Sequence, residues 1–426
     1  MDRYRIDTKC VQSGYHPGNG EPRIPPIVQS TTFRYESSEM MGSLFDLERE
    51  GYFYTRLGNP TAGHVEAKIA DLEGGTGALL TSSGQAATLL SVLNLCKSGD
   101  HMVSTSALYG GTFNLFDKTL RDLGIDMTFV DPDADDQTLD AAFRENTRLV
   151  FGETLSNPSL VVLDIDRFAH AAHNHSVPLI VDNTFPTPIH CRPFEFGADI
   201  VVHSTSKYMD GHACALGGVI VEGGSFDWKN GKFPGLSEPD TSYHGVVYAD
   251  RFGPGAFLAK ARTHLMRDLG PTPSPFNAFL LNLGLETLAL RMERHCSNAM
   301  TVAKWLEKND QVSWVNYPAL ASSPYRSLVS RYMPNGTCGV VSFGVAGGRD
   351  SAIRFMDSLK LAAIVTHVAD SRTCVLHPAS TTHRQLDAKK LAEAGVRDDM
   401  IRLSVGIENP DDILADLDQA LMAARI

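Results

Sequence analysis

The chain has 426 residues, 43% of them hydrophobic and 21% charged, so it can bury a large core in two or three domains. Its formal net charge of -12 leaves no basic surplus for phosphates, which argues against a nucleic-acid partner. The start, MDRYRIDTKC, has no apolar run behind its charges, and no segment suits a bilayer, so we expect a cytoplasmic protein without membrane contact. The seven cysteines are dispersed, which favours free thiols in a reducing compartment.

The first part of the chain, residues 1–62, is predicted to be an irregular, extended arm. The stretch GNGEPRIPPIVQSTTF is rich in Gly and Pro, which disfavour regular elements. The arm ends in YTRLGNPT, where Tyr54 and Arg56 project to the same side of an extended chain. The fork of Arg56 suits a phosphate, although an ordinary surface arm explains these residues equally well.

A helix at 62–72, a strand at 77–82 and a second helix follow the arm. The second helix opens with SSGQAA, where Ser83 suits the N-cap. The free N–H groups beside Gly84 and Gln85 could bind an anion, or the turn could be a plain cap. Neither GxGxxG before a helix nor GxxxxGK[ST] occurs, so an anion bound here belongs to neither a dinucleotide nor a P-loop nucleotide.

Strands and helices then alternate, as in an α/β fold. The expected strands lie at 101–106, 126–131 and 148–155, and the expected helices at 113–123 and 165–175. Tyr109 and Asn157 follow two of these strands, at the edge where open α/β sheets bind ligands. Tyr109 could stack on a planar cofactor ring or simply pack against the sheet.

The strongest chemical signal lies in residues 177–221. Three short runs rich in Val and Ile, VPLIVD, ADIVVHS and LGGVIV, indicate buried strands. The first ends in Asp182, and the second in HSTSKY, which contains Ser204, Ser206 and Lys207. Lys207 could form a Schiff base with pyridoxal phosphate, Asp182 could keep its pyridine nitrogen protonated, and the serines could bind its phosphate. Each residue alone suits a loop or cap, but their combination favours the cofactor.

The rest of the chain is predicted to form a loop and a smaller domain. Residues 222–257 are expected to be an ordered loop over the site, and residues 282–309 a long helix. WVNYPAL, CGVVSFGV and IRLSVGI indicate strands of a second sheet. Arg402, in the last of them, needs an anionic partner, either a substrate carboxylate or a structural acid. His377 and His383 lack a third ligand, so no metal is expected.

Several motifs together resemble the Cys/Met-metabolism pyridoxal-phosphate enzymes of fold type I over almost the whole chain. They are YTRLGNPT at 54–61, SSGQAA at 82–87, LYGGTF at 108–113, SNP at 156–158, VDNTF at 181–185, HSTSKY at 203–208, HPASTTH at 377–383 and RLSVG at 402–406. The resemblance implies a mostly parallel seven-stranded sheet with helices on both faces, plus a smaller α+β C-terminal domain. It divides the chain into an arm at 1–62 that contacts a neighbouring subunit, a cofactor domain at 63–265 and a small domain at 266–426.

The resemblance also implies roles for individual residues. Three would be catalytic: the Schiff-base Lys207, the pyridinium partner Asp182 and the ring-stacking Tyr109. The phosphate would be bound by Ser83, Gly84, Gln85, Ser204 and Ser206. Tyr54 and Arg56 would reach the phosphate of the neighbouring subunit. The amino-acid substrate would be bound by Asn157, Thr373, Arg402 and Tyr54.

Within the family, the segments 226–245, 267–296 and 403–421 look most like those of O-acetylhomoserine sulfhydrylases. The implied reaction joins O-acetyl-L-homoserine with sulfide, or with a thiol such as methanethiol, to give L-homocysteine or methionine and acetate. A methionine or cystathionine γ-lyase is the alternative, although Gly111 replaces the reactive cysteine of methionine γ-lyases. A cofactor-binding protein without turnover is a third possibility. The resemblance implies a homo-oligomer, a dimer with shared sites or a tetramer.

Overall fold

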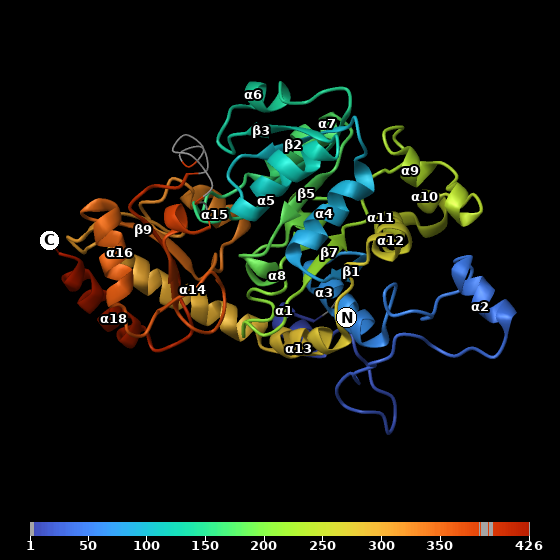
Figure 1. Ribbon diagram of the computed structural model, residues 1–426, viewed down its shortest axis with the longest axis horizontal. Helices are drawn as coiled ribbons and strands as arrows, with labels where there is room; N and C mark the ends of the chain where they lie inside the picture. The colour runs from blue at the N-terminus through green and yellow to red at the C-terminus, as the bar shows by residue number, and fades with distance from the viewer. Residues whose placement is uncertain (1–3, 383, 385–390, 392–394, 426) are drawn as a thin grey trace.

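The computed structural model describes residues 4–382, 384, 391 and 395–425, and two β-sheets organise them (Figure 1). The larger sheet has seven strands in the order β1-β7-β6-β5-β4-β2-β3. They are β1 (Gly77–Thr81), β2 (His101–Thr105), β3 (Asp126–Val130), β4 (Thr147–Glu153), β5 (Leu179–Asp182), β6 (Ile200–His203) and β7 (Gly218–Glu222). The sequence predicts all seven, and the structure confirms them.

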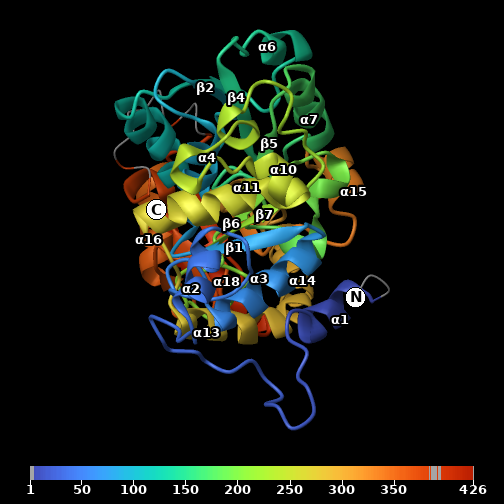
Figure 2. The ribbon, with the colours of Figure 1, turned by 90° about the vertical axis from the view of Figure 1, so that its right-hand side faces the viewer.

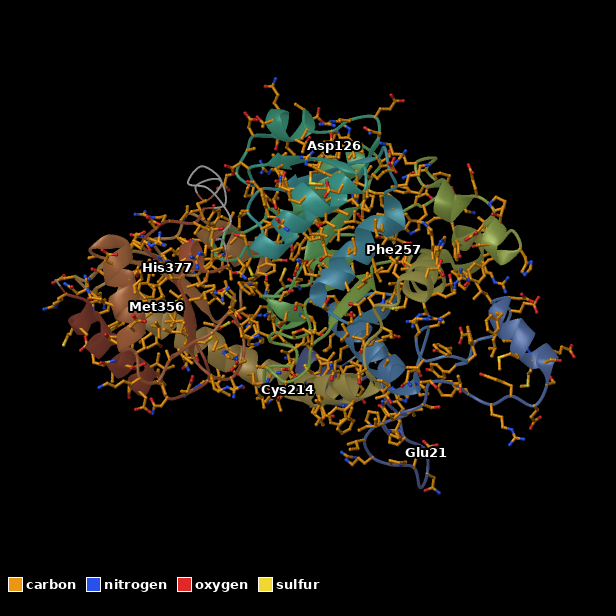
Figure 3. The ribbon with its side chains drawn as sticks, viewed as in Figure 1. Glu21, Asp126, Cys214, Phe257, Met356 and His377 are labelled. Atoms are coloured by element: carbon orange, nitrogen blue, oxygen red, sulfur yellow. The ribbon has the colours of Figure 1, made fainter. Side chains whose placement is uncertain are left out.

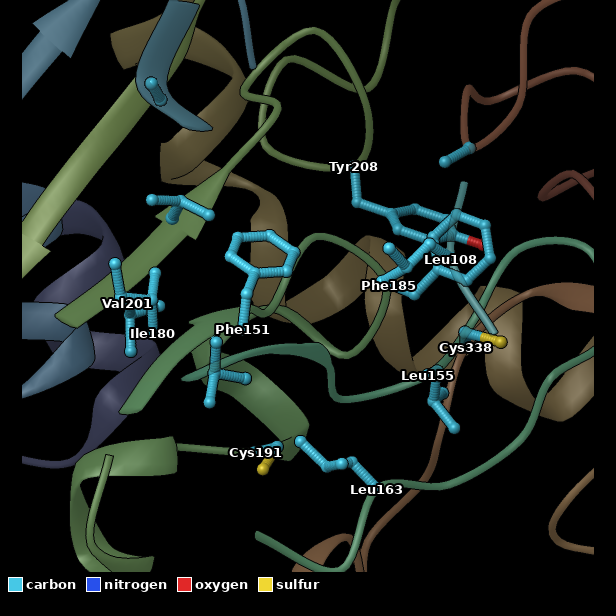
Figure 4. Packing of buried hydrophobic residues seen from close by; sticks show 14 of the residues in the cluster. Leu108, Phe151, Leu155, Leu163, Ile180, Phe185, Cys191, Val201, Tyr208 and Cys338 are labelled. Atoms are coloured by element: carbon cyan, nitrogen blue, oxygen red, sulfur yellow. The ribbon is translucent and has the colours of Figure 1, made fainter. Parts of the chain in front are cut away.

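Most neighbouring strands of the larger sheet run parallel. β3, β2, β4, β5 and β6 share one direction, whereas β7 runs antiparallel to both of its neighbours, β1 and β6. Phe151 of β4, Ile180 of β5 and Val201 of β6 lie together in the buried core (Figure 4). Because parallel strands end at the same edge, the residues that follow β4, β5 and β6 converge there.

Helices cover both faces of the larger sheet (Figure 1, Figure 2). α4 (Gly84–Leu95) contacts four of its strands, and it begins at Ser83, whose hydroxyl accepts a hydrogen bond from the Ala86 N–H at 3.1 Å. Besides α4, the α-helices between residue 60 and the end of β7 are α3 (Pro60–Glu73), α5 (Gly110–Asn114) with its π-helical extension Leu115–Leu120, α6 (Asp136–Asp140), α7 (Ile165–Asn174) and α8 (Thr187–His190).

The smaller sheet has five strands in the order β10-β11-β12-β9-β8. They are β8 (Val312–Asn316), β9 (Val340–Val345), β10 (Ala363–Ile364), β11 (Cys374–Leu376) and β12 (Met400–Ser404). The sequence predicts β8, β9 and β12 but misses β10 and β11, because two or three residues carry no readable period. The helices of this part are α15 (Arg326–Tyr332), α16 (Gly348–Ser358) and α18 (Pro410–Ala424).

Two expectations about the chain outside the sheets are wrong. The arm is not wholly irregular, because α1 (Ile6–Gln12) and α2 (Ser38–Phe45) form on either side of its Gly- and Pro-rich stretch. α1 packs on α3, α13 (Pro275–Glu286) and α14 (Leu288–Leu306). The single helix expected at 282–309 is instead α13 and α14, which meet at Thr287, a residue that no breaker signal marks.

The segment 222–257 does not lie over a site within its own chain. It contains α9 (Pro234–Ser237) and α10 (Tyr248–Phe252), which pack on α11 (Ala256–Lys260). Trp228 and Phe233 anchor it in the core, with ring centroids 5.3 Å apart. After α11, a π-helical turn (Ala261–Met266) leads to α12 (Arg267–Leu269). Within the described part of the chain, no helix combines the length and apolar character that a bilayer span requires.

Candidate active site

A cavity of about 410 Å³ lies at the carboxyl ends of β4, β5 and β6, where the smaller sheet faces the larger one. Chain segments that are far apart in sequence line it, from the start of α4 to β12. Ten of the residues predicted for the site line this cavity: Ser83, Gly84, Gln85, Tyr109, Asn157, Asp182, Ser204, Ser206, Lys207 and Arg402.

The start of α4 and the loop after β6 form a tight cradle on one side of the cavity. A Cβ atom at Gly84 would lie 2.6 Å from Cβ of Ser204, so only glycine fits there. The Ser204 hydroxyl has no hydrogen-bond partner among the described residues, and the N–H groups of Gly84 and Gln85 at the start of α4 have none within the helix. Ser206 differs, because its hydroxyl accepts from the Gly217 N–H at 2.9 Å and donates to the Gly217 carbonyl at 3.1 Å. The cradle therefore suits an anion, with Ser204 better placed than Ser206.

Two carboxyl groups lie on the floor of the cavity, at the ends of β4 and β5. Asp182 Oδ1 accepts from the Thr184 N–H at 2.9 Å and from the Thr184 hydroxyl at 2.5 Å. Glu153 accepts from the backbone N–H groups of Tyr109 at 2.7 Å and Asn157 at 3.3 Å. Burial and the charge of Asp182 raise the pKa of Glu153 well above its usual value. Burial also raises the pKa of Asp182, although the hydrogen bonds from Thr184 oppose this rise, so Asp182 is better able than Glu153 to carry a negative charge.

Lys207 lies in the loop after β6, with its amine in the cavity. Burial lowers the pKa of Lys207 to about 8, and the positive charge of Arg402 adds to this effect. In the part of the chain that the structure describes, no acid pairs with the amine, whose hydrogen-bond partner is His367 Nδ1 at 3.3 Å. A substantial fraction of Lys207 is therefore neutral near pH 8 and can act as a base or nucleophile.

Arg402 extends from the centre of the smaller sheet to the cavity and is only 3% exposed. It donates to Asn157 Oδ1 at 3.2 Å and to the carbonyls of Thr366 and His367 at 3.3 and 3.2 Å. Its Nε is buried without a partner, and no carboxylate of the described residues pairs with it. Of the two expected partners for Arg402, the structural acid is thus not found, and the cavity is left with an unpaired cation that suits a carboxylate.

Three predicted site residues do not line this cavity. Tyr54 and Arg56 lie in the arm, with the Arg56 guanidinium 5.0 Å from the Tyr54 ring centroid. The Thr373 hydroxyl donates to Glu408 at 2.9 Å and accepts from the Gly406 N–H at 2.9 Å, and its assignment to substrate binding stays a prediction.

The metal expectation is tested only in part. His377, labelled in Figure 3, hydrogen-bonds to the Ser380 hydroxyl and the Asp398 carbonyl. His383 lies outside the described residues, within which no cluster of His, Cys, Asp or Glu could hold a metal ion.

Sequence reasoning misses several residues that line the cavity, including Glu153, Thr184 and His367. Glu153 could have been found, because it lies near the end of the strand predicted at 148–155 and is the last residue of β4. Thr184, two residues after Asp182, fits the local turn in which an Asp accepts from the N–H two residues on. His367 lies in no predicted element and gives no such signal.

Comparison with known proteins supports this geometry. The family model of Cys/Met metabolism PLP-dependent enzymes matches residues 7–422. The chain belongs to this family. It is 47% identical to a homocysteine synthase from Schizosaccharomyces pombe over 100% of both chains. It is 43% identical to an O-acetyl-L-homoserine sulfhydrylase from Leptospira meyeri, over 98% of this chain and 97% of that one.

A solved structure agrees with the fold as well. The crystal structure of a Campylobacter jejuni protein described as an O-acetylhomoserine (thiol)-lyase has a TM-score of 0.95 and 36% identity, and covers 98% of this chain and 100% of that one. It contains N'-pyridoxyl-lysine-5'-monophosphate. This chain is therefore an enzyme that depends on pyridoxal phosphate. Its own residues fit that cofactor: a cradle open to an anion at Gly84, the carboxyl group of Asp182 at the end of β5 and a buried amine on Lys207.

Proposed function

We propose that the protein catalyses γ-replacement on an O-acylated homoserine, joining O-acetyl-L-homoserine and sulfide, or methanethiol, to give L-homocysteine or methionine and acetate. The observation that carries the proposal is Arg402, a buried guanidinium without an acid partner that faces the same cavity as Lys207. The names of the relatives from Leptospira meyeri and Schizosaccharomyces pombe support the same chemistry.

Five residues of the cavity have specific roles in this proposed reaction. When bound, pyridoxal phosphate supplies a conjugated ring that accepts the electron pair left on the α-carbon. Asp182 would keep a proton on the ring nitrogen, and Tyr109 would stack on the ring. Arg402 and Asn157 bind the substrate carboxylate, which fixes the Cα–H bond relative to Lys207. The neutral amine of Lys207 takes the α-proton.

We extend the proposal to the assembly. The chain comprises an arm at 1–62, a cofactor domain at 63–265 and a small domain at 266–426, and the arm reaches the site of a second copy. Tyr54 is 40% exposed, and the buried Arg56 Nε has no partner among the residues that the structure places, which supports a role outside their own chain. The protein is then a dimer with shared sites, within a cytoplasmic tetramer.

Shared sites predict complementation between two inactive variants. The Lys207→Ala chain retains an intact arm, and the Tyr54→Ala/Arg56→Ala chain retains Lys207. In a mixed dimer, one site therefore combines the intact arm of the first chain with the Lys207 of the second chain and is complete. Random mixing of refolded or co-expressed chains should restore about a quarter of the wild-type activity, because half of the dimers are mixed and each has one good site of two. Activity that stays at the level of the separate variants would place Tyr54 and Arg56 outside the shared site.

Product analysis tests the proposed reaction against a γ-lyase. The purified protein is mixed with O-acetyl-L-homoserine, with and without sulfide or methanethiol, and the visible spectrum and products are followed. Formation of homocysteine or methionine only with the acceptor present supports the transferase. Release of 2-oxobutyrate and ammonia without an acceptor would assign a γ-lyase. A cofactor band that no amino acid changes would indicate a binding protein without turnover.

A further inference from the structure

Glu153 ends β4 as a buried carboxyl group that lines the cavity, and the proposed mechanism gives it no role. Its Oε1 accepts a hydrogen bond from the Tyr109 backbone N–H at 2.7 Å, and its Oε2 accepts from the Asn157 N–H at 3.3 Å. Both partners do have roles in that mechanism, Tyr109 at the cofactor ring and Asn157 at the substrate carboxylate. One side chain therefore joins the two loops that carry these residues.

Tyr109 has few other anchors among the residues that the structure describes. It precedes α5 without capping that helix through its side chain, and it is followed by Gly110 and Gly111, which leave the backbone free to adopt other conformations. A Cβ atom at Gly111 would lie 2.6 Å from Tyr109 Cε1, so the ring folds back over the start of α5. Tyr109 is 40% exposed, so packing does not fix it. The hydrogen bond to Glu153 therefore holds the backbone from which the ring projects.

Asn157 is held at more points than Tyr109. Its side chain accepts from Arg402 at 3.2 Å, and the carbonyl of the next residue, Pro158, accepts from the Ser342 hydroxyl at 2.6 Å. The contact between its N–H and the carboxyl group is a third anchor, and it is the longer of the two contacts that this carboxyl group makes. Loss of the carboxyl group should therefore displace Tyr109 further than Asn157.

The two contacts together require a carboxyl group. A carboxyl group has two oxygens that accept hydrogen bonds, whereas an amide has one such oxygen and an NH2 group that would oppose the second N–H. Burial and the charge of Asp182 raise the pKa of Glu153, and the two N–H groups oppose that rise. The protonated acid still offers lone pairs on its oxygens, so the contacts do not depend on its charge. Glutamate thus meets a requirement that glutamine in its place would not.

We propose that Glu153 is a positioning residue that fixes the Tyr109 ring and the Asn157 amide relative to each other, and so aligns the cofactor with the donor. It acts through the two backbone N–H groups and transfers no proton. The proposed γ-replacement, on which this inference rests, supplies the donor whose carboxylate Asn157 binds. Loss of Glu153 should therefore disturb the cofactor ring and the binding of the donor together.

The holoenzyme offers a separate readout for each of the two loops. Pyridoxal phosphate has no chiral centre, so the circular dichroism of its visible band, divided by the absorbance, reports how the surrounding side chains, Tyr109 among them, hold the ring. KM for O-acetyl-L-homoserine, measured together with kcat at saturating sulfide, reports the binding of the donor carboxylate. In Glu153→Ala, we expect the dichroism ratio to fall at least about twofold and KM for the donor to rise about 3- to 10-fold.

Glu153→Gln separates the two contacts. The carbonyl of the glutamine should keep the shorter contact, with Tyr109, while its NH2 group opposes the Asn157 N–H. We therefore expect a dichroism ratio within about 20% of wild type, together with a KM for the donor that rises about 3- to 10-fold. A general loss of packing would not leave the ring in place while it weakens the donor.

Glu222→Gln is the matched control for this variant. Glu222 ends β7, lies outside the cavity and also accepts from two backbone N–H groups, those of Phe257 at 3.2 Å and Leu258 at 3.0 Å. We expect Glu222→Gln to lower the unfolding temperature and to leave both readouts at their wild-type values.

Each remaining outcome has a distinct meaning. Wild-type dichroism and wild-type KM in Glu153→Ala or in Glu153→Gln would overturn the positioning role, because an amide cannot serve both N–H groups. Equal changes in Glu222→Gln would also overturn it, since they would show what the loss of any buried carboxyl group does. A wild-type enzyme that forms no homocysteine from O-acetyl-L-homoserine and sulfide would instead contradict the proposed function, while the dichroism would still test the contact with Tyr109.

Discussion

Lys207→Ala is expected to lower the turnover of O-acetyl-L-homoserine by about 10³-fold or more. The amine of Lys207 is the base of the proposed reaction, and its pKa of about 8 leaves a useful neutral fraction near neutral pH. A methyl group replaces the aminobutyl side chain in the variant, so the base of the proposed reaction is lost. Steady-state rates of product formation at saturating donor measure the effect.

Lys260→Ala is the matched control for that variant. Lys260 is another buried lysine whose pKa burial lowers to about 8, but its amine donates to the Asn94 carbonyl at 2.7 Å, remote from the cavity. We expect Lys260→Ala to reduce thermal stability while turnover by the folded fraction stays within about twofold of wild type. Comparable losses of turnover in the two variants, or a Lys207→Ala enzyme that retains most of its activity, would contradict the assignment of Lys207.

Arg402→Lys is expected to raise KM for the amino-acid donor about 10- to 100-fold, with a smaller change in kcat. Lysine keeps the charge but loses the planar fork that can bind a carboxylate through two hydrogen bonds. Because Arg402 has no acid partner within the described chain, the loss should fall on the substrate and not on an internal ion pair. KM for sulfide should change little, since the acceptor has no carboxylate.

Arg291→Lys tests whether any buried arginine would give the same result. Arg291 is 5% exposed and donates to the carbonyls of Tyr208 at 2.6 Å and Gly284 at 2.5 Å and to the Thr287 hydroxyl at 3.1 Å, and it does not line the cavity. We expect this variant to lower the unfolding temperature and to leave KM for the donor within about twofold of wild type. A KM that rises as much in Arg291→Lys as in Arg402→Lys would show that general loosening, and not carboxylate binding, explains the effect.

Sequence predicts best those site residues whose side chains suit the chemistry and which also lie at the end of a predicted strand or at the start of a predicted helix. Asp182 and Lys207 follow short buried strands, and parallel strands bring their ends to one edge, so sequence alone places both in one cavity. Ser83 and Gly84 can be predicted for a similar reason, because Ser83 suits the N-cap of a helix and Gly84 follows it. Family resemblance then adds the roles that residue types leave open.

The parts that sequence misses depend on contacts made over long distances. Thr373 has the hydroxyl that the resemblance requires, but the sequence does not show that this hydroxyl hydrogen-bonds to Glu408 and to the Gly406 N–H. His367 meets Lys207 across 160 positions of sequence, and no local period marks it. The arm residues Tyr54 and Arg56 cannot be assigned to any site from one chain, because their expected partner is a second copy.

The strand order of the larger sheet also bears on how the chain is made. β1 is its first strand in sequence and lies at the edge, where its one neighbour is β7, the last strand. The ribosome adds the residues from 82 to 217 before β7 begins, which takes on the order of 10 to 30 s at bacterial or eukaryotic elongation rates. Throughout that interval the backbone edge of β1 has no partner strand and is open to other chains. If this protein aggregates during expression, the first variable to adjust is therefore the rate of translation initiation or the growth temperature. Lowering either one reduces the number of nascent chains present together.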